Sequence, residues 1–229
     1  MSALCDIAVV IAARNPGALL VETLDSVAAQ TMLPTEVIVV DDGSTDGSVE
    51  AATWGRESVR VCTIEPSGRS IARNTGVQQS AASMLLFLDA DDLLTPDALR
   101  LLCGELRAHP SAEMVHGLTY EFADTRNPPG PGARHGNQVV DVRLGGCTLL
   151  RRSLWDRAGG LDPALSQGEW IEWIDRAGKH ARGVVRVDEV VLHRRLHGAN
   201  GTASTATQSD YLAVARAALQ RKRQQGAQQ

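Results

Sequence analysis

Three short apolar runs constrain the fold of this chain more than any other feature. They are residues 7–12 (IAVVIA), 36–40 (EVIVV) and 84–88 (MLLFL), and a segment that we expect to be helical follows each of them. A run without polar alternation is typical of a strand buried on both faces of a sheet. Strands of this kind alternating with helices predict an α/β fold, in which a mostly parallel sheet is flanked by helices.

The rest of the chain extends this pattern less regularly. We expect helices over residues 19–29, 45–52, 68–80, 98–107 and 168–177, further strands over 58–64, 114–122, 147–150 and 184–192, and a terminal helix over 209–223. Residues 123–137 contain the run PPGPG and predict an irregular loop. No clear linker is visible, and a domain of about 100–200 residues is typical, so we expect one domain with two lobes.

Composition excludes several classes of protein. The chain has 23 Lys and Arg against 27 Asp and Glu, a net charge of -4, which argues against a nucleic-acid partner. Its four cysteines lie about 40 residues or more apart and suit neither a zinc knuckle nor a disulfide framework, so we expect free thiols in a reducing compartment. Without a signal peptide or an apolar run of about 18 residues, we expect a cytoplasmic protein whose membrane contact, if any, is peripheral at the inner face.

Polar residues stand where each of the three runs ends. They are residues 13–15 (ARN), 41–42 (DD) and 89–91 (DAD). Because ligands of parallel α/β sheets bind beyond the carboxyl ends of the strands, these residues indicate a site on one edge. Asp89 and Asp91, two positions apart, can spread toward a ribose and toward a hydrated Mg²⁺ or Mn²⁺. A solvated acidic turn that caps the next helix is the alternative interpretation.

Two further residues point to a nucleotide. A carboxylate at Asp42 can accept a hydrogen bond from a base or a sugar hydroxyl, although an Asx turn would explain it equally. Arg73 lies in residues 68–76 (GRSIARNTG), and its guanidinium has the geometry to pair with a diphosphate. A satisfied polar helix face is the alternative for Arg73.

In this order the segments resemble the family 2 glycosyltransferases of the GT-A fold. The resemblance rests on IAVVIAARN, EVIVVDDGSTDGS, GRSIARNTGV, MLLFLDADD, GGCTLLRR, WDRAGGLDP, GEWIEWIDR and LHRRLHGAN. It implies a GT-A domain over residues 1–208 with a Rossmann-like sheet. Residues 1–110 would bind the nucleotide, 111–208 would form an acceptor-binding lobe, and 209–229 would be a C-terminal helix and tail.

The resemblance also implies which residues contact the nucleotide. Ala13 and Arg14 would lie against the base, and Asp42 or Asp41 would bind the base or the ribose. Arg73 would lie near the base and the diphosphate.

Contacts with the cation and the donor sugar are implied for the next segments. Asp89, Ala90 and Asp91 would form the DxD motif of the family, with Asp91 as the main metal ligand. Gly145 and Gly146 would allow the backbone to approach the donor sugar and the acceptor. His197 would contact the metal or the diphosphate, and one of the two preceding arginines, Arg194 or Arg195, would assist it.

The chain departs from the family at the catalytic base. Many members carry a Glu-Asp pair before an aromatic residue of the acceptor-site helix, and the Asp acts as the base. Here the segment reads Gly168-Glu169-Trp170, so that Glu169 takes the Asp position. Glutamate can perform the same proton transfer. Glu172, one turn on, is the alternative base, and a carboxylate that favours the helix dipole is the alternative role of Glu169.

The implied reaction is inverting sugar transfer by a single in-line displacement. The donor would be a nucleoside-diphosphate sugar, with UDP as the expected carrier, and the cofactor a divalent cation, Mn²⁺ or Mg²⁺. The acceptor hydroxyl would belong to a saccharide, a lipid-linked intermediate, a peptide or a small molecule. Residues 123–137 and 198–208 are candidate lids. A catalytically degenerate sugar-nucleotide-binding subunit and a nucleotidyltransferase are the alternatives, whereas a GxGxxG dinucleotide motif is absent.

Overall fold

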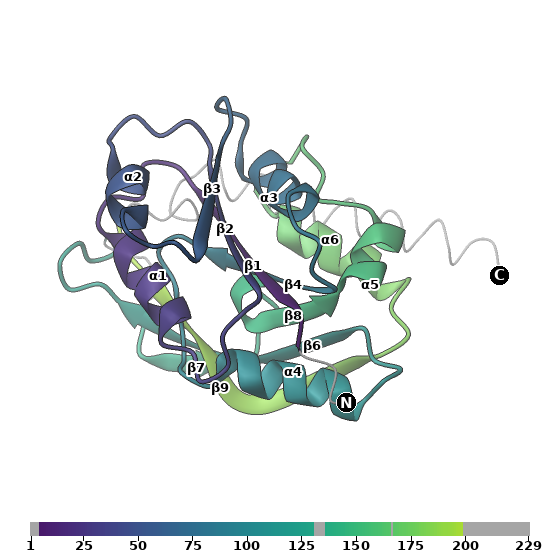
Figure 1. Cartoon of the computed structure of the whole chain (residues 1–229). Helices are drawn as coiled ribbons and strands as arrows, with labels where there is room; N and C mark the ends of the chain where they lie inside the picture. Colours follow the sequence, from purple (N-terminus) through teal and green to yellow (C-terminus); the bar gives the residue numbers. More distant parts are fainter. Residues whose placement is uncertain (1–4, 131–135, 166, 199–229) are drawn as a thin grey trace.

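One sheet runs through the molecule and has helices on both of its faces (Figure 1). The computed structural model describes residues 5–130, 136–165 and 167–198, and nine strands of these residues form the sheet. The predicted helix at 209–223 and most of the second candidate lid lie outside the described residues. Within the described part, no helix is both long and apolar enough to cross a membrane.

The first half of the sheet is parallel, as predicted. Its order is β3 (Val59–Thr63), β2 (Glu36–Asp41), β1 (Ile7–Ala13) and β4 (Met84–Asp89). In the register of the sheet, Ala13 lies opposite Asp41 and Ala12 lies opposite Asp89. The three predicted strands therefore end side by side, and the loops that follow them share one edge.

The second half of the sheet is mixed, which refines the expectation of a mostly parallel sheet. Here β8 (Thr148–Arg151) pairs antiparallel with both β4 and β6 (Met114–Ala123), and β9 (Val184–Leu196) pairs parallel with β6. Two short strands complete it, β5 (Leu93–Leu94) beside β9 and β7 (Gln138–Val140) beside β6. Because Leu93 pairs with His193, the turn after β4 lies next to the end of β9.

Helices cover both faces because β1, and β4 up to its last residue Asp89, are apolar. On one face α1 (Leu19–Ala28), α2 (Ser48–Thr53) and α4 (Ala98–Ala108) pack on Ile7, Val9 and Ile11. On the other face α5 (Arg152–Ala158) and α6 (Glu169–Gly178) pack with the end of α3 (Arg69–Gln78) on Ala8 and Val10. Alternate side chains of a strand point to opposite faces, so an unbroken apolar run is what this two-sided burial requires.

The cysteine prediction is wrong for one pair. A disulfide joins Cys5, just before β1, to Cys103 on α4, whereas Cys62 and Cys147 are free. The partners are 98 residues apart, so their spacing carries no signal. They meet because α4 packs on the face of the sheet where β1 begins.

Candidate functional site

A cavity of about 710 Å³ opens where β1, β2 and β4 end. The loops after these strands line it together with the start of α3 and the end of β9. The structure thus brings together segments from both ends of the described chain. Nine of the residues predicted from the sequence line the cavity, namely Ala13, Arg14, Asp42, Arg73, Asp89, Ala90, Asp91, Arg194 and His197.

Asn15 ties the loop after β1 to the loop after β2. Its backbone N–H donates to Ser44 Oγ at 2.9 Å, and its side-chain oxygen accepts the N–H of Thr45 at 2.8 Å. Asn15 has a φ of 48°, a left-handed conformation that asparagine tolerates better than most residues. These contacts hold the backbone next to Arg14, which lines the cavity.

Asp42 organises the entrance to α3. Its carboxylate, only 4% exposed, accepts the backbone N–H of Ser67 at 2.6 Å and that of Gly68 at 2.9 Å. Gly43 follows with a φ of 69°, and a Cβ at this position would lie 2.6 Å from the Pro66 ring, so that both the turn and the close approach require glycine. Asp41 instead accepts a backbone N–H within its own turn and does not line the cavity.

Arg73 joins two carboxylates from opposite sides of the cavity. Its guanidinium is buried and donates to Asp89 Oδ1 and, at 2.8 Å, to Glu169 Oε1. Desolvation in the cavity opposes ionisation of Asp89, but the charges of Arg73 and then Arg69 outweigh it and lower the pKa of that carboxyl. Arg69 lies one turn earlier on α3, with its Nε 3.8 Å from the same oxygen of Glu169.

The turn after β4 concentrates negative charge. Carboxylate oxygens of Asp89, Asp91 and Asp92 all lie within 4.8 Å of one another. Burial raises the pKa of Asp92 well above its ordinary value, and the charges of Asp91 and Asp89 raise it further. Such a group of hard oxygen ligands fits Mg²⁺ or Mn²⁺. His197 joins the turn from beyond β9, with its Nε2 2.9 Å from Asp91 Oδ2.

The two candidate bases have different surroundings. Glu169 is the first residue of α6 and contacts Arg73, which lines the cavity, although Glu169 itself is buried behind this lining. Glu172 lies outside the lining and pairs through both oxygens with Arg176, each at 3.0 Å. Arg176 in turn donates to the carbonyl oxygens that end α5. Glu169 thus contacts a residue of the cavity lining and Glu172 pairs within its own helix, and which of them acts as the base stays a prediction.

Besides Asp41, three predicted donor contacts lie away from the cavity lining. Arg195 is buried in contacts with neighbouring elements. Gly145 and Gly146 form a 3₁₀ turn in which a Cβ would lie 2.6 Å from the Phe87 carbonyl oxygen and 2.8 Å from Leu192, respectively. These glycines permit close packing on β4 and β9, and their contact with a donor stays a prediction.

Sequence reasoning missed several residues of the site. Asn74 exchanges two hydrogen bonds with the backbone of Leu161, at 2.8 and 2.9 Å, and so holds the loop before α6 against α3. The position of Asn74 in the sequence does not predict this contact. Arg69 lies four positions before Arg73, which places both arginines on one helix face, so the sequence could have predicted Arg69 as a residue of the site. Asn127 also lines the cavity, from the loop after β6.

This fold and site define the class as a GT-A-type α/β domain, and comparison with known proteins gives the family. The model described as "Glycosyl transferase family 2" matches residues 8–157, well over half of the chain. The chain therefore belongs to glycosyl transferase family 2.

Individual relatives agree with this assignment. The chain is 31% identical over 191 residues to the glycosyltransferase YwdF of Bacillus subtilis, covering 77% of this chain and 69% of YwdF. It is 25% identical over 222 residues to the glycosyltransferase alr2836 of Nostoc sp., covering 88% and 68%. The structure of S. aureus TarS 1-349 in complex with UDP-GlcNAc matches with a TM-score of 0.72 at 19% identity, which shows the fold alone. The match covers 87% of this chain and 61% of the TarS 1-349 chain. The chain thus spans 68% to 69% of the length of the two curated relatives, and 39% of the longer TarS chain.

Proposed function

We propose that this chain transfers a sugar from a UDP-sugar to an acceptor hydroxyl, with inversion at the anomeric carbon and with a divalent cation as cofactor. The observation that carries the proposal is the cavity itself. Its lining joins the strand ends at Arg14 and Asp42 to the carboxylate turn after β4, and Glu169 lies directly behind Arg73. A nucleotide, its diphosphate and a base are the three parts that such a transfer needs.

The nucleoside would lie over the loops after β1 and β2. Ala13 and Arg14 form one wall there, and the Asp42 carboxylate lies at the base of the cavity. The complex of TarS with UDP-GlcNAc supports UDP as the carrier, because that fold is similar to this one. We propose a hydroxyl of a saccharide, lipid-linked, peptide or small-molecule acceptor as the second substrate.

The diphosphate would lie between the carboxylate turn and the cationic side of the cavity. Asp91 and His197 would hold the cation, together with the neighbouring carboxylates Asp89 and Asp92. When bound, a divalent cation would neutralise the charge that the departing diphosphate gains. Arg194, which lines the cavity, would add positive charge on the same side.

Glu169 would remove the proton of the acceptor hydroxyl as that oxygen attacks. A single displacement needs one base only, unlike the paired carboxylates of glycoside hydrolysis. The bond from Arg73 fixes the orientation of Glu169 through Oε1, which leaves Oε2 to accept the proton. Glu169, at the start of α6, is thus both at the position that the family resemblance implies and bonded to a residue of the cavity lining.

Two assays test the proposal. The first measures Tm in the presence of UDP, GDP, dTDP and their sugars, each with and without Mn²⁺. The second measures the release of free nucleotide from the nucleotide sugars. We expect UDP-sugars with Mn²⁺ to raise Tm most and UDP to be released slowly even without an acceptor. Stabilisation with no UDP release over days would favour the degenerate binding subunit. Release of pyrophosphate in a parallel reaction with UTP and a sugar 1-phosphate would favour the nucleotidyltransferase. No stabilisation by any of these nucleotides would overturn the proposal.

A further inference from the structure

Arg195 occupies an unexpected place for a residue next to the cavity. It lies near the end of β9 and is 3% exposed, and its side chain runs behind the carboxylate turn rather than into the cavity. The Arg195 guanidinium therefore contacts other protein groups rather than the cavity, and these contacts indicate what Arg195 does.

Arg195 holds the carboxylate turn at two successive residues. Its backbone N–H donates to Asp92 Oδ1 at 2.8 Å, and its Nε donates to the carbonyl oxygen of Asp91 at 3.0 Å. The side chain of Asp92 and the backbone of Asp91 are thus both fixed by one residue. Since a cation site needs its carboxylates to converge within a few tenths of an ångström, the backbone of this turn determines whether they do.

The same guanidinium is anchored on two other elements. Its Nη2 lies 2.6 Å from Glu22 Oε2 on α1, and its Nη1 lies 3.3 Å from Asp124 Oδ2, just after β6. The Phe122 ring lies beneath it, 5.0 Å from the guanidinium carbon. The turn is therefore connected to α1, β6 and β9 through a single buried side chain, with both outer carboxylates supplying its counter-charge.

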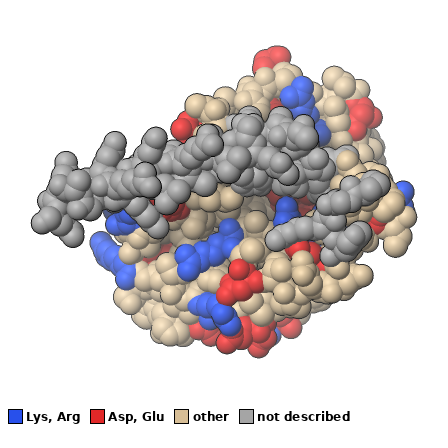
Figure 2. All heavy atoms as spheres, turned by 180° about the vertical axis from the view of Figure 1, so that it is seen from behind, with Lys and Arg blue, Asp and Glu red and all other residues tan. Residues whose placement is uncertain are grey.

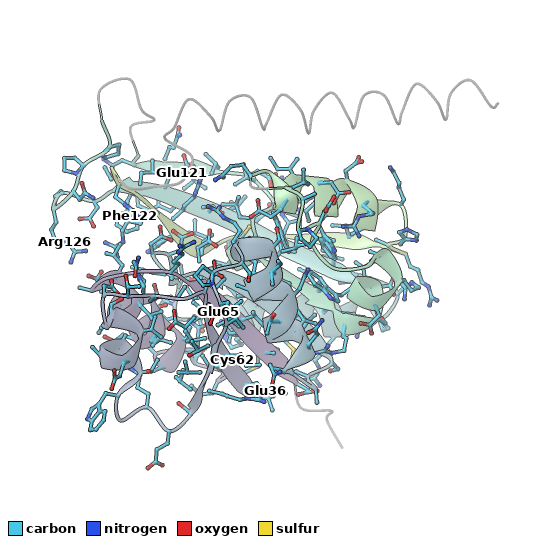
Figure 3. All side chains as sticks on the ribbon, turned by 90° about the horizontal axis from the view of Figure 1, so that it is seen from above. Glu36, Cys62, Glu65, Glu121, Phe122 and Arg126 are labelled. Atoms are coloured by element: carbon cyan, nitrogen blue, oxygen red, sulfur yellow. A yellow bond between two sulfur atoms is a disulfide. The ribbon has the colours of Figure 1, made fainter. Side chains whose placement is uncertain are left out.

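Arg126 shares these carboxylates without reaching the turn. It donates to Glu22 at 2.7 Å and to Asp124 at 3.1 Å, and its side chain is 57% exposed. In Figure 3 Phe122 and Arg126 lie at the same corner of the molecule, at and beyond the end of β6. Arg126 therefore provides a matched control, because it has the same charge and the same two outer carboxylate partners, while its contacts within the described part of the chain do not reach residues 89–92.

We propose that Arg195 is a positioning residue for the divalent cation: it fixes the turn of residues 89–92 so that the carboxylates converge, and it does not bind the donor. The identity of the ligand as a cation rests on the proposed function. The role differs from the donor contact that the family resemblance implies for Arg195. It predicts that loss of this side chain weakens cation binding and leaves donor binding intact once the cation is saturating.

The test measures binding of Mn²⁺ alone to the purified full chain by electron paramagnetic resonance. For Arg195→Met we expect the Kd for Mn²⁺ to rise about tenfold or more, as for other residues that orient metal ligands. Arg195→Lys should recover part of the affinity, and Arg126→Met should stay within about twofold of the parent. In transfer assays at saturating Mn²⁺, Arg195→Met should regain the parent KM for the UDP-sugar, whereas Arg194→Met should not.

The results that would overturn the inference also show whether the proposed function fails with it. If Arg195→Met binds Mn²⁺ like the parent, or if Arg126→Met weakens binding equally, the positioning role is wrong while the proposed function stands. If the parent binds no Mn²⁺, with or without UDP, the cation role in the proposed function fails as well. If Arg195→Met does not fold, Glu22→Gln serves instead. This substitution weakens the ion pair at Arg195 Nη2, and Glu22 itself does not contact residues 89–92. It should then weaken Mn²⁺ binding more than Arg126→Met does, and an equal effect would overturn the role.

Discussion

Arg73 couples the two sides of the candidate site at the scale of single residues. Its two bonds run to Asp89 at the end of β4 and to Glu169 at the start of α6. The pair of Arg73 with Glu169 is buried, and such pairs lose much of their favourable energy to desolvation, so they are weak grounds for stability. The value of Arg73 is geometric, because one planar guanidinium holds both the cavity-lining carboxylate of Asp89 and the proposed base.

Glu169→Gln separates catalysis from binding. The amide oxygen of Gln can still accept the hydrogen bond of Arg73, but it cannot accept a proton from the acceptor. We expect kcat to fall by about 10²–10⁴-fold with KM for the donor little changed. Glu172→Gln is the control, since Glu172 pairs with Arg176 away from the cavity, and it should keep most of its kcat. Parent-like turnover in Glu169→Gln would move the base to another residue.

Asp91→Asn tests the cation site. The substitution keeps the size of the side chain and removes one negative charge from the carboxylate turn, so we expect transfer to be nearly abolished at any Mn²⁺ concentration. The unfolding temperature without Mn²⁺ should fall little or rise, because repulsion with Asp92 is relieved. Asp41→Asn is a suitable control, as Asp41 lies outside the cavity lining. Full activity in Asp91→Asn would refute its role as a metal ligand.

Asp124 gives the protein a measurable pH dependence. Hydrogen bonds from Arg126 lower the pKa of Asp124 to about 2 from its ordinary 3.8. A carboxyl group whose pKa is lower in the folded than in the unfolded state stabilises the folded state. This stabilisation is complete at pH values above the unfolded-state pKa of 3.8, and it is lost as the pH falls through the folded-state pKa of about 2. Urea unfolding should therefore show Arg126→Met less stable than the parent at pH 6, with the difference shrinking from pH 4 toward pH 2. A difference that grows on acidification would contradict this assignment.

The residues of the site were predictable to different degrees, and the reason is physical. Asp42, Asp89 and Asp91 stand at strand ends, where register alone dictates their shared edge. Arg195 lies one residue from Arg194, yet only the latter lines the cavity. Which of two neighbouring side chains faces the cavity depends on the twist and irregular register of β9 against β6, which local sequence does not encode.

At the scale of elements, α3 depends on Gly76 for its approach to the sheet. A Cβ there would lie 2.3 Å from Val10 Cγ1 and 3.2 Å from Val40 Cγ2. Gly76→Ala should destabilise the fold by about 1–3 kcal/mol despite the better helix propensity of alanine, because α3 must move away from β1. Arg69 and Arg73 would move with it, so activity should fall too. Urea unfolding and kcat measure the two effects.

Gly104 on α4 offers the matched control for this prediction. A Cβ at Gly104 would meet nothing within 4 Å, so Gly104→Ala should stabilise the protein by about 0.5–1 kcal/mol through helix propensity alone. If both substitutions stabilise the protein, close packing of α3 on β1 does not limit this helix position.

Elements with an apolar run or a helical period of their own were predictable from sequence. The strands β1, β2 and β4 and the helices α1, α4 and α6 appear within a few residues of their expected bounds, and so do the shorter α2, β3 and β8. The helix α5 and the strands β5 and β7 were missed, because these segments are formed by their tertiary partners rather than by their own propensity.

At the scale of the whole molecule, charge is balanced rather than concentrated. On the part of the face that Figure 2 describes, basic and acidic side chains are interspersed, in keeping with the net charge of -4. The cavity lining is also mixed, with Arg14, Arg69, Arg73 and Arg194 lining it together with Asp42, Asp89, Asp91 and Asp92.

The disulfide between Cys5 and Cys103 connects the start of the sheet to α4 and spans 98 residues of chain. Sequence spacing could not reveal it, because the contact arises only once α4 packs against the sheet. Closing so long a loop restricts the unfolded chain, so reduction should lower the free energy of unfolding by about 4 kcal/mol. Urea unfolding with and without reductant measures this, and Cys62→Ala, at a free cysteine, should leave the difference unchanged. Thiol titration of the unfolded, unreduced protein should find the thiols of Cys62 and Cys147 only, and reaction of Cys5 and Cys103 as well would show that the bond does not form.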